Sequence, residues 1–328
     1  MGDVLTVILW VLLGLVGLAL VLVIAVAFLL YFVVYARNIP KYGTLLLGDN
    51  MTSDMSDPVE VNRVNWAKET ETYVENHEPE ELHTLSFDGL KLYGRLLKGD
   101  PECKRVVILV HGYHSSSTMD FGNVVQFYHV KGYHVFLPDN RAHGQSEGKL
   151  LGFGWLDRRD VITWCKKLIR RFTPDCEIIL SGVSMGAAAV MMASGEKDLP
   201  KQVRLIIEDC GFTGAIPQFE YMFPQQVRFL AKPVLFFDNL ISLIFNRHSI
   251  YKASSVKQVA LTDRPMLFIH GEEDTFVPTD MVYENYDACN APKKILIMPN
   301  AHHAQSCNAD FERYTATVDQ FIQEVLGS

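Results

Sequence analysis

Three side chains in this sequence have the types that nucleophilic catalysis requires. Ser184 stands at the centre of residues 182–186, which read Gly-Val-Ser-Met-Gly, and Asp274 and His303 follow later in the chain. A serine hydroxyl is a poor nucleophile at neutral pH until an imidazole accepts its proton. A carboxylate must hold that imidazole in one tautomer and stabilise its protonated form. The chain order Ser, Asp, His therefore predicts acyl transfer through a serine-bound intermediate.

Each of these residues follows a segment that we predict to be a buried strand. An apolar run leads into the Ser184 turn, and an Ala- and Met-rich helical segment begins directly after it. Because glycine has no Cβ, the two flanking glycines permit a tight turn that leaves the Ser184 hydroxyl at the positive end of the following helix. Asp274 comes shortly after the strand 266–269, and His303 follows the strand 294–298. Sites in parallel sheets lie beyond the carboxyl ends of the strands, so we expect the three side chains to meet there.

Strands and helices alternate along most of the sequence. Apolar runs short enough to be buried strands are separated by amphipathic segments of helical length. This alternation predicts an α/β fold with a doubly wound, mostly parallel sheet. We expect a hairpin before the parallel strands, since Asp88-Gly89 is a turn signal between two predicted strands. Besides the strand before Ser184, the predicted strands are 83–87, 90–96, 105–110, 133–137, 205–208, 266–269 and 294–298, with helices over about 119–131 and 156–171.

Five sequence blocks resemble the α/β-hydrolase family, and more narrowly its membrane-anchored or secreted serine hydrolases of the oligopeptidase-like and esterase-like branch. In chain order they are His-Gly-Tyr at 111–113, Asp-Asn-Arg-Ala-His-Gly-Gln-Ser at 139–146, Gly-Val-Ser-Met-Gly at 182–186, the block 270–278 and His-Ala-Gln-Ser at 303–306. Five blocks in the family's order are specific, and the resemblance covers roughly residues 82–326. It implies the α/β-hydrolase fold and a serine hydrolase activity that needs no metal or organic cofactor.

The resemblance also implies which residues act as base and acid. His303 corresponds to the family's catalytic histidine, and the adjacent His302 is the alternative. Asp274 corresponds to the catalytic acid. Asp209, at the end of another predicted strand, is the alternative because some members of the fold place the acid there.

The family's oxyanion hole uses two backbone N–H groups, one directly after the nucleophile and one in the loop after the His-Gly strand. In this sequence these belong to Met185 and Tyr113. We expect His111 and His143 to shape the loops around them, since a lone loop histidine is more often a hydrogen-bonding group than a catalytic one.

No charged residue lies between Asp3 and Arg37, a span of 33 positions rich in Leu, Val, Ala and Phe. A helix needs about 20 apolar residues to cross a bilayer core, so residues 1–36 predict a transmembrane anchor. A signal peptide cleaved near 25–27 is the alternative. The apolar run is too long for that, continues past the cleavage position and has no Lys or Arg before it.

The flanks of this span predict how it lies in the membrane. The interfacial aromatic residues that we expect are Trp10, Tyr31 and Tyr35. Arg37 and Lys41 follow the span, so the positive-inside rule favours a cytoplasmic catalytic domain. Six scattered cysteines without metal-ligand spacing favour the same reducing side, whereas a glycosylation sequon at 50–52 favours the opposite one.

The remaining sequence divides into a tether and a catalytic domain. Residues 37–80 are polar and predict a tether with one helix, which begins at Asp57. Its predicted apolar stripe consists of Val59, Trp66 and Tyr73. Residues 81–328 form the catalytic domain, in which 211–262 exceed a plain connection and predict a helical cap. The apolar residues of this cap either pack against the sheet or form an acyl pocket for a hydrophobic substrate near the bilayer.

The composition and the candidate catalytic residues separate four classes of function. The net charge of −8 and the lack of basic clusters argue against a nucleic-acid binder. We favour a membrane-tethered serine hydrolase that cleaves carboxylic esters or thioesters of a small-molecule or lipid-like acyl substrate. The alternatives are a serine peptidase, for which an obvious acidic site is missing, and a hydrolase-fold binding protein, against which the intact Ser, Asp and His argue. Because the hydrolase core begins near Leu82 and takes no strand from the anchor, we expect removal of residues 1–36 to leave a folded, soluble domain. Its turnover on short soluble esters should be nearly unchanged, since no proposed catalytic group lies before Tyr113.

Overall fold

An eight-stranded sheet with the order β1-β2-β4-β3-β5-β6-β7-β8 lies at the centre of the computed structural model, which describes residues 2–38 and 55–327. β1 and β2 form the predicted hairpin, and β2 runs antiparallel to β4, whereas the other neighbours are parallel. The prediction of a doubly wound, mostly parallel sheet is confirmed. The strands are β1 (Glu80–Leu85), β2 (Lys91–Leu97), β3 (Arg105–Val110), β4 (His134–Pro138), β5 (Glu177–Val183), β6 (Val203–Asp209), β7 (Met266–Gly271) and β8 (Lys293–Met298).

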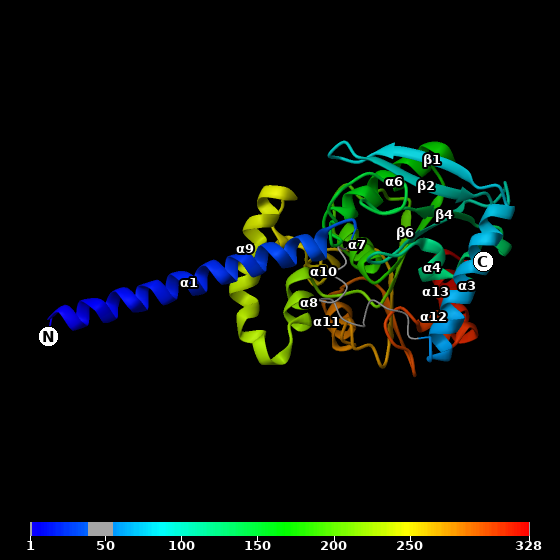
Figure 1. Cartoon of the computed structure of the whole chain (residues 1–328). Helices are drawn as coiled ribbons and strands as arrows, with labels where there is room; N and C mark the ends of the chain where they lie inside the picture. Colours follow the sequence, from blue (N-terminus) through cyan, green and yellow to red (C-terminus); the bar gives the residue numbers. More distant parts are fainter. Residues whose placement is uncertain (1, 39–54, 328) are drawn as a thin grey trace.

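Helices cover both faces of this sheet (Figure 1). One apolar core lies between the sheet and α6, α7 and α11, and a second lies between the opposite face and α4, α5 and α13. The central strands are apolar nearly throughout because both of their faces are covered. The helices are α4 (Ser117–Phe121), α5 (Val124–Val130), α6 (Asp157–Arg171), α7 (Met185–Ser194), α11 (Asp280–Ala288), α12 (Ser306–Ala309) and α13 (Phe311–Leu326).

The segment expected as one helix over 119–131 forms two helices, α4 and α5. Gly122 between them has a φ of 45°, in the left-handed region that glycine adopts without steric cost. A Cβ at this position would lie 3.2 Å from the Cβ of Trp66 in α3 (Pro58–Asn76). The chain therefore turns at a glycine where α3 approaches closely.

α3 packs on the α/β domain with a different face from the predicted one. Its buried residues are Glu60, Ala67, Thr70 and Val74. The predicted stripe of Val59, Trp66 and Tyr73 is only half-buried. Hydrophobic periodicity does not detect the true face because two of its residues, Glu60 and Thr70, are polar. Glu60 is buried beside its ion-pair partner Arg63.

α1 (Gly2–Tyr35) is an uninterrupted helix that carries the N-terminus far from the α/β domain (Figure 1). It is long and apolar enough to cross a membrane, and no side chain before Ala27 is buried. At 1.5 Å per residue, residues 3–26 extend over about 36 Å, which exceeds the ~30 Å of a bilayer core. The sequon at 50–52 and Lys41 lie outside the described residues, and the membrane side of the domain stays a prediction.

One face of the last two turns of α1 is buried inside the protein. Tyr31 and Tyr35 are 0% and 1% exposed, and their rings stack with centroids 4.4 Å apart. The prediction that these two tyrosines lie at a membrane–water interface is wrong, whereas Trp10 is 69% exposed. The reason is that a uniformly apolar helix gives no signal that separates its exposed turns from the turns that pack on the protein.

Hydrogen bonds also join α1 to the α/β domain. The Tyr35 carbonyl accepts the N–H of Leu151 at 2.8 Å. The Tyr113 hydroxyl donates to the Val34 carbonyl at 2.8 Å. Sequence analysis did not predict these contacts between α1 and the domain, and the folding of the domain without residues 1–36 stays a prediction.

The segment predicted as a cap, 211–262, is helical and lies beside α1 (Figure 1). It consists of α8 (Ala215–Met222), η2 (Gln225–Leu230), α9 (Ala231–Phe245), η3 (Ile250–Lys252) and α10 (Ser255–Val259). At the end of α9, the ring of Phe245 lies 6.5 Å from that of Phe28 and 5.2 Å from that of Phe32. A third apolar core unites the cap, the end of α1 and Met185, which follows Ser184.

We expect removal of residues 1–36 to destabilise the protein. It deletes Tyr31 and Tyr35, and each large buried side chain contributes about 1.5–3 kcal/mol to the free energy of unfolding. The apparent unfolding temperature in detergent should fall by at least about 6 °C. Removal of residues 1–23, which keeps every buried side chain of α1, should leave it unchanged. Equal unfolding temperatures of the two shortened proteins would contradict the docking of α1.

Candidate active site

Ser184 lies in the turn between β5 and α7, as the sequence predicts. Its φ is 55° and its ψ is −117°, a strained conformation for a residue other than glycine. A Cβ on Gly186 would collide with the carbonyl of Val110, and one on Gly182 would collide with the carbonyl of Gly186. The two glycines therefore let the turn pack tightly, and the Ser184 side chain projects at the N-terminus of α7.

The structure brings Ser184, Asp274 and His303 together. Ser184 Oγ lies 2.8 Å from His303 Nε2, and His303 Nδ1 lies 2.7 Å from Asp274 Oδ2. The three residues come from the segments after β5, β7 and β8, at the carboxyl ends of these strands. In this geometry His303 can accept the Ser184 proton while Asp274 fixes the opposite ring nitrogen.

His302, the alternative base, points elsewhere. Its Nδ1 lies 2.9 Å from the Glu273 carbonyl, and 53% of its side chain is exposed. The imidazole of His303 is 21% exposed and directed at Ser184. The geometry favours His303.

Asp209, the alternative acid, supports the Ser184 turn without reaching the imidazole through a hydrogen bond. Its carboxylate accepts the Ser306 hydroxyl at 2.7 Å, and its carbonyl accepts the Ser184 N–H at 2.8 Å. The geometry favours Asp274 as the acid.

Asp274 is held as a carboxylate by its surroundings. Burial raises the pKa of this carboxyl, but the charge of His303 and hydrogen bonds from His270 and His303 outweigh burial and bring the pKa well below its usual range. Its Oδ1 accepts the N–H groups of Phe276 and Val277, both at 2.9 Å. His270 Nε2 lies 3.3 Å from Oδ2. Sequence analysis assigned no role to His270, although it opens the block that contains Asp274.

The loop after β3 offers a free backbone N–H group close to Ser184, that of Tyr113. The N–H of Gly112 donates to Asp120 at 2.6 Å, and the N–H of His114 donates to His143 at 3.0 Å. Between them, the N–H of Tyr113 has no hydrogen-bond partner in the described part of the chain. The arrangement leaves Tyr113 as the free donor of this loop.

Met185 supplies the second donor. It is the first residue of α7, where N–H groups have no partner within the helix. Its N–H also has no partner among residues 2–38 and 55–327, whereas the preceding N–H of Ser184 donates to the Asp209 carbonyl. Tyr113 and Met185 remain the predicted oxyanion donors.

Comparisons with known proteins agree with this arrangement. Residues 101–235 match the family model described as Serine aminopeptidase, S33. The uncharacterised protein YqkD of Bacillus subtilis (strain 168) is 26% identical over 259 residues, which cover 76% of this chain and 82% of YqkD. The uncharacterised membrane protein YNL320W of Saccharomyces cerevisiae is 26% identical over 248 residues, which cover 73% of this chain and 80% of YNL320W. The solved Pyrococcus furiosus esterase Pf2001 shares the fold, with a TM-score of 0.59 and 24% identity over 78% of this chain and 94% of the esterase.

The chain has the α/β-hydrolase fold. The resemblance inferred from the five sequence blocks is thereby confirmed. The family match covers the Ser184 turn and ends at residue 235, before Asp274 and His303. For these two residues, the geometry supports the assignment and the family match does not extend to them.

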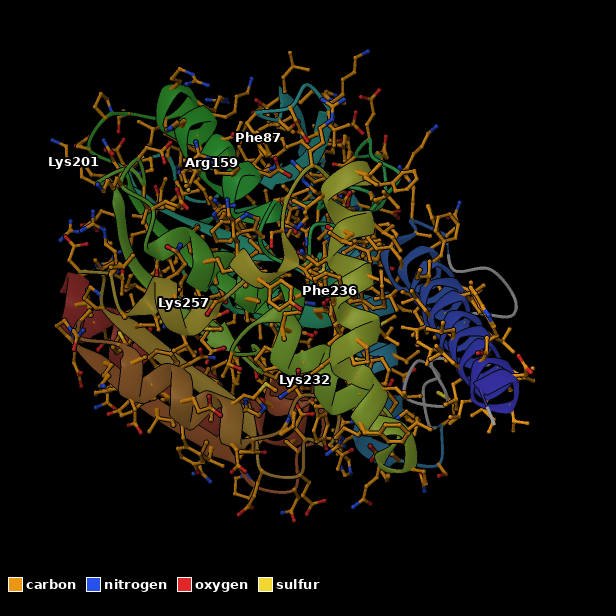
Figure 2. The ribbon with its side chains drawn as sticks, turned by 90° about the vertical axis from the view of Figure 1, so that its left-hand side faces the viewer. Phe87, Arg159, Lys201, Lys232, Phe236 and Lys257 are labelled. Atoms are coloured by element: carbon orange, nitrogen blue, oxygen red, sulfur yellow. The ribbon has the colours of Figure 1, made fainter. Side chains whose placement is uncertain are left out.

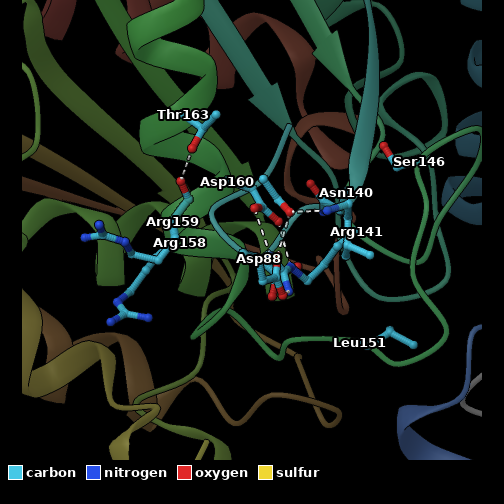
Figure 3. A network of polar contacts seen from close by, with 12 residues as sticks. Asp88, Asn140, Arg141, Ser146, Leu151, Arg158, Arg159, Asp160 and Thr163 are labelled. Atoms are coloured by element: carbon cyan, nitrogen blue, oxygen red, sulfur yellow. Dashed lines mark hydrogen bonds and ion pairs between the residues drawn. The ribbon is translucent and has the colours of Figure 1, made fainter. Parts of the chain in front are cut away.

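In this α/β-hydrolase fold, Arg141 anchors the loop that supports the Tyr113 donor. Its guanidinium donates to Asp160 of α6 at 2.6 and 2.9 Å and to Asp88 of the β1–β2 turn at 3.0 and 3.1 Å (Figure 3). Arg141 is only 2% exposed. Two residues later, burial lowers the pKa of His143 to about 3, so that its neutral Nε2 accepts the N–H of His114. His143 thus shapes the loop, as expected.

Arg141→Met should destabilise this α/β-hydrolase fold by about 3–5 kcal/mol, because the buried Asp160 carboxylate loses its partner. Arg159→Met, on the same helix as Asp160 but half-exposed in ion pairs with Glu196 and Asp198, should cost less than about 1 kcal/mol. Denaturant unfolding in one detergent compares them. Similar losses from both changes would show that the Arg141 network contributes no more than a surface pair.

A polar cleft of about 600 Å³ opens on one side of Ser184. One wall comes from the start of α3, through Asp57, Glu60 and Arg63. These residues were missed by sequence analysis, which treated α3 as part of a tether. The only signal was the helix cap at Asp57, which indicates a helix start and no site.

The carboxylates of the cleft are engaged by the protein. Asp57 accepts hydrogen bonds from Val59 and Gln305, both at 2.9 Å. Glu60 pairs with Arg63 at 2.7 and 2.8 Å. Asp120 accepts the N–H of Gly112 and the Ser115 hydroxyl. Each of these carboxylates therefore already accepts hydrogen bonds that hold the walls of the cleft together.

One group of residues in the described chain has the spacing of metal ligands. Cys210, Asp274 and His303 offer atoms within 4.8 Å of one another. Burial raises the pKa of the Cys210 thiol well above its usual range, and a neutral thiol is a weak ligand. Asp274 and His303 already bond to each other. The set fits the hydrogen-bonded chain to Ser184 better than a metal.

Proposed function

We propose that this protein is a membrane-anchored serine hydrolase that cleaves carboxylic esters or thioesters through an acyl-enzyme. The observation that carries the proposal is the hydrogen-bonded chain from Ser184 through His303 to Asp274. The chain ends at a hydroxyl in a strained turn, next to two unpartnered backbone donors. An intact constellation of this kind favours an enzyme over a binding protein of the same fold.

The reaction follows from this geometry. His303 accepts the Ser184 proton as Oγ attacks the acyl carbonyl, and the N–H groups of Tyr113 and Met185 receive the negative charge on oxygen. The bond to the leaving oxygen or sulfur then breaks, and His303 gives its proton to the alcohol or thiol. Water attacks the acyl-enzyme with His303 as base, which releases the acid and restores Ser184. Asp274 stays ionised and stabilises the imidazolium in both halves.

Membrane anchoring is supported by α1, whose unburied residues 3–26 are long enough to cross a bilayer core. The helix also packs through its last two turns onto the catalytic domain, which would hold the domain close to the membrane. A cytoplasmic domain stays the prediction from Arg37 and the scattered cysteines.

A serine peptidase is the second candidate, because the matching family model is described as a serine aminopeptidase. Peptidases of that kind must bind a charged amine at the substrate terminus. The carboxylates near Ser184 already accept hydrogen bonds from the protein, as described above for the polar cleft. This arrangement favours esters over peptides.

The experiment compares the purified full-length protein in detergent on p-nitrophenyl esters and on aminoacyl p-nitroanilides, with fluorophosphonate labelling alongside. We expect labelling and ester turnover, with kcat/KM for the best ester at least about 100-fold above that for the best anilide. A higher kcat/KM on anilides would establish the peptidase. No labelling and no turnover would leave the binding protein as the function.

A further inference from the structure

A second cavity, of about 420 Å³, lies between the end of α1 and the cap. We call it the anchor–cap cavity. α1 contributes Leu30, Val34 and Tyr35 to its walls, and the cap contributes apolar residues such as Phe219 and Leu235. Its volume is in the range of small-molecule binding sites.

The anchor–cap cavity leads toward Ser184. A small apolar cavity touches Ser184 and shares four lining residues with the anchor–cap cavity, Val34, Phe219, Met222 and Phe276. These four side chains line both spaces and so stand where the two adjoin. Met222 has three rotatable bonds and adapts its shape readily, which would let an acyl chain pass between them.

The cap also presents apolar side chains to its surroundings next to α1. Those exposed by 41% to 76% on η2 and α9 are Phe229, Phe236, Leu240, Leu243, Ile244 and Phe245. Figure 2 views the molecule from the side of the N-terminus, with α9 and Phe236 in the foreground. Exposed apolar surface of this extent marks an interaction surface. It meets the apolar surface of α1 at Phe245, whose ring lies against that of the exposed Phe28, and this continuity makes the bilayer its partner.

We propose that the anchor–cap cavity binds the long acyl chain of a membrane lipid ester and that α1 itself forms one wall of this site. The inference rests on the proposed function. Ser184 lies between the two spaces, with the polar cleft on one side and the apolar route on the other. An ester with a polar alcohol and a long acyl chain fits this division, with its carbonyl at Ser184. The chain reaches the site from the bilayer along α1 and remains in apolar surroundings.

Asp238 of α9 gives the cavity a polar feature. It lines the anchor–cap cavity, is 4% exposed and has no hydrogen-bond partner in the described chain. Burial raises the pKa of this carboxyl to about 7. In its neutral form it tolerates an apolar chain beside it, whereas its ionised form places a charge in the wall.

The first experiment measures chain-length preference in the full-length protein, as the ratio of kcat/KM for p-nitrophenyl laurate to that for p-nitrophenyl acetate in one nonionic detergent. Leu30→Trp fills the cavity from α1 and should lower this ratio at least about tenfold, because methylene-sized contacts are worth about 10- to 200-fold. Met222→Trp should do the same from the cap side. Leu29→Trp, on the exposed side of α1, is the matched control and should leave the ratio unchanged.

An unchanged ratio in both Leu30→Trp and Met222→Trp, with acetate turnover intact, would overturn the proposal and leave the proposed function standing. A protein that hydrolyses neither ester and is not labelled by a fluorophosphonate would overturn both. The two failures are thus distinguishable.

The second experiment varies pH from 6 to 8 and follows the same ratio, because any change in the catalytic groups affects both esters alike. As Asp238 ionises, the laurate-to-acetate ratio should fall several-fold in the unmodified protein and stay constant in Asp238→Asn. The titratable groups around this carboxyl are Tyr31 and Tyr35 of α1 and Tyr251 of η3, with Tyr221 and Arg228 on the same cavity. Tyrosines do not ionise in this range unless perturbed downward, and arginine stays charged. A ratio independent of pH in the unmodified protein would mean that the chain does not pass Asp238, and would overturn the proposal.

Discussion

Ser184→Ala should lower the rate of ester hydrolysis by about 10⁴- to 10⁶-fold, because no other group can form the acyl-enzyme. The change removes one oxygen from a side chain that is 7% exposed and leaves the backbone of the turn as it is. The fold should therefore persist, with an unfolding temperature close to that of the unmodified protein. Covalent labelling by a fluorophosphonate should disappear together with turnover.

Ser194→Ala is the matched control for this change. Ser194 is also a buried serine of the same strand–turn–helix unit, at the end of α7, and its hydroxyl donates to the Met191 carbonyl at 2.7 Å. It should keep both labelling and turnover. If Ser184→Ala retained a tenth of the original rate, Ser184 would not be the nucleophile.

His303→Ala should be as damaging as the serine change, about 10⁴- to 10⁶-fold in rate. The imidazole is the only group within hydrogen-bond distance of the Ser184 hydroxyl in the described chain, and its loss also removes a partner of the buried Asp274. Steady-state hydrolysis of one p-nitrophenyl ester measures the effect, with circular dichroism to verify the fold.

The adjacent histidine provides an internal comparison. His302→Ala should lower the rate by less than about tenfold, because it removes an exposed imidazole with one hydrogen bond, to the Glu273 carbonyl, of about 0.5–1.5 kcal/mol. The reverse ranking of the two variants would transfer the role of base to His302 and leave Ser184 and Asp274 in place.

The sheet and the meeting of Ser184, Asp274 and His303 could be predicted because strand periodicity and chain order carry this information. A residue directly after a parallel strand must lie near the carboxyl end of that strand, so three such residues meet at one edge of the sheet. Choosing between His302 and His303, or between Asp209 and Asp274, depends on the direction of side chains in loops. The sequence resemblance could rank these alternatives, but only the geometry separates them.

The walls of the site were harder to predict than its centre. α3 reaches the polar cleft with Glu60 and Arg63, whose burial depends on their mutual ion pair and is invisible to a hydrophobic pattern. The end of α1 reaches the other side with Leu30 and Val34, in a run whose composition is the same in its exposed turns and in the turns that pack on the protein. Both segments precede the block that resembles the family, and nothing in their sequence points to a distant strand.

Under the proposed membrane anchoring, the docking of Tyr31 and Tyr35 into the cap would make bilayer thickness a mechanical variable for this protein. Residues 3–26 extend over about 36 Å, so a hydrocarbon core of ~30 Å is matched when the helix tilts by roughly 30°. Because the helix end is fixed to the domain by packing and hydrogen bonds, the domain tilts together with the helix. A thinner membrane would therefore turn the apolar side of α9 to a different angle against the lipid headgroups, and membranes of different thickness would present the same protein with its cap engaged to different extents.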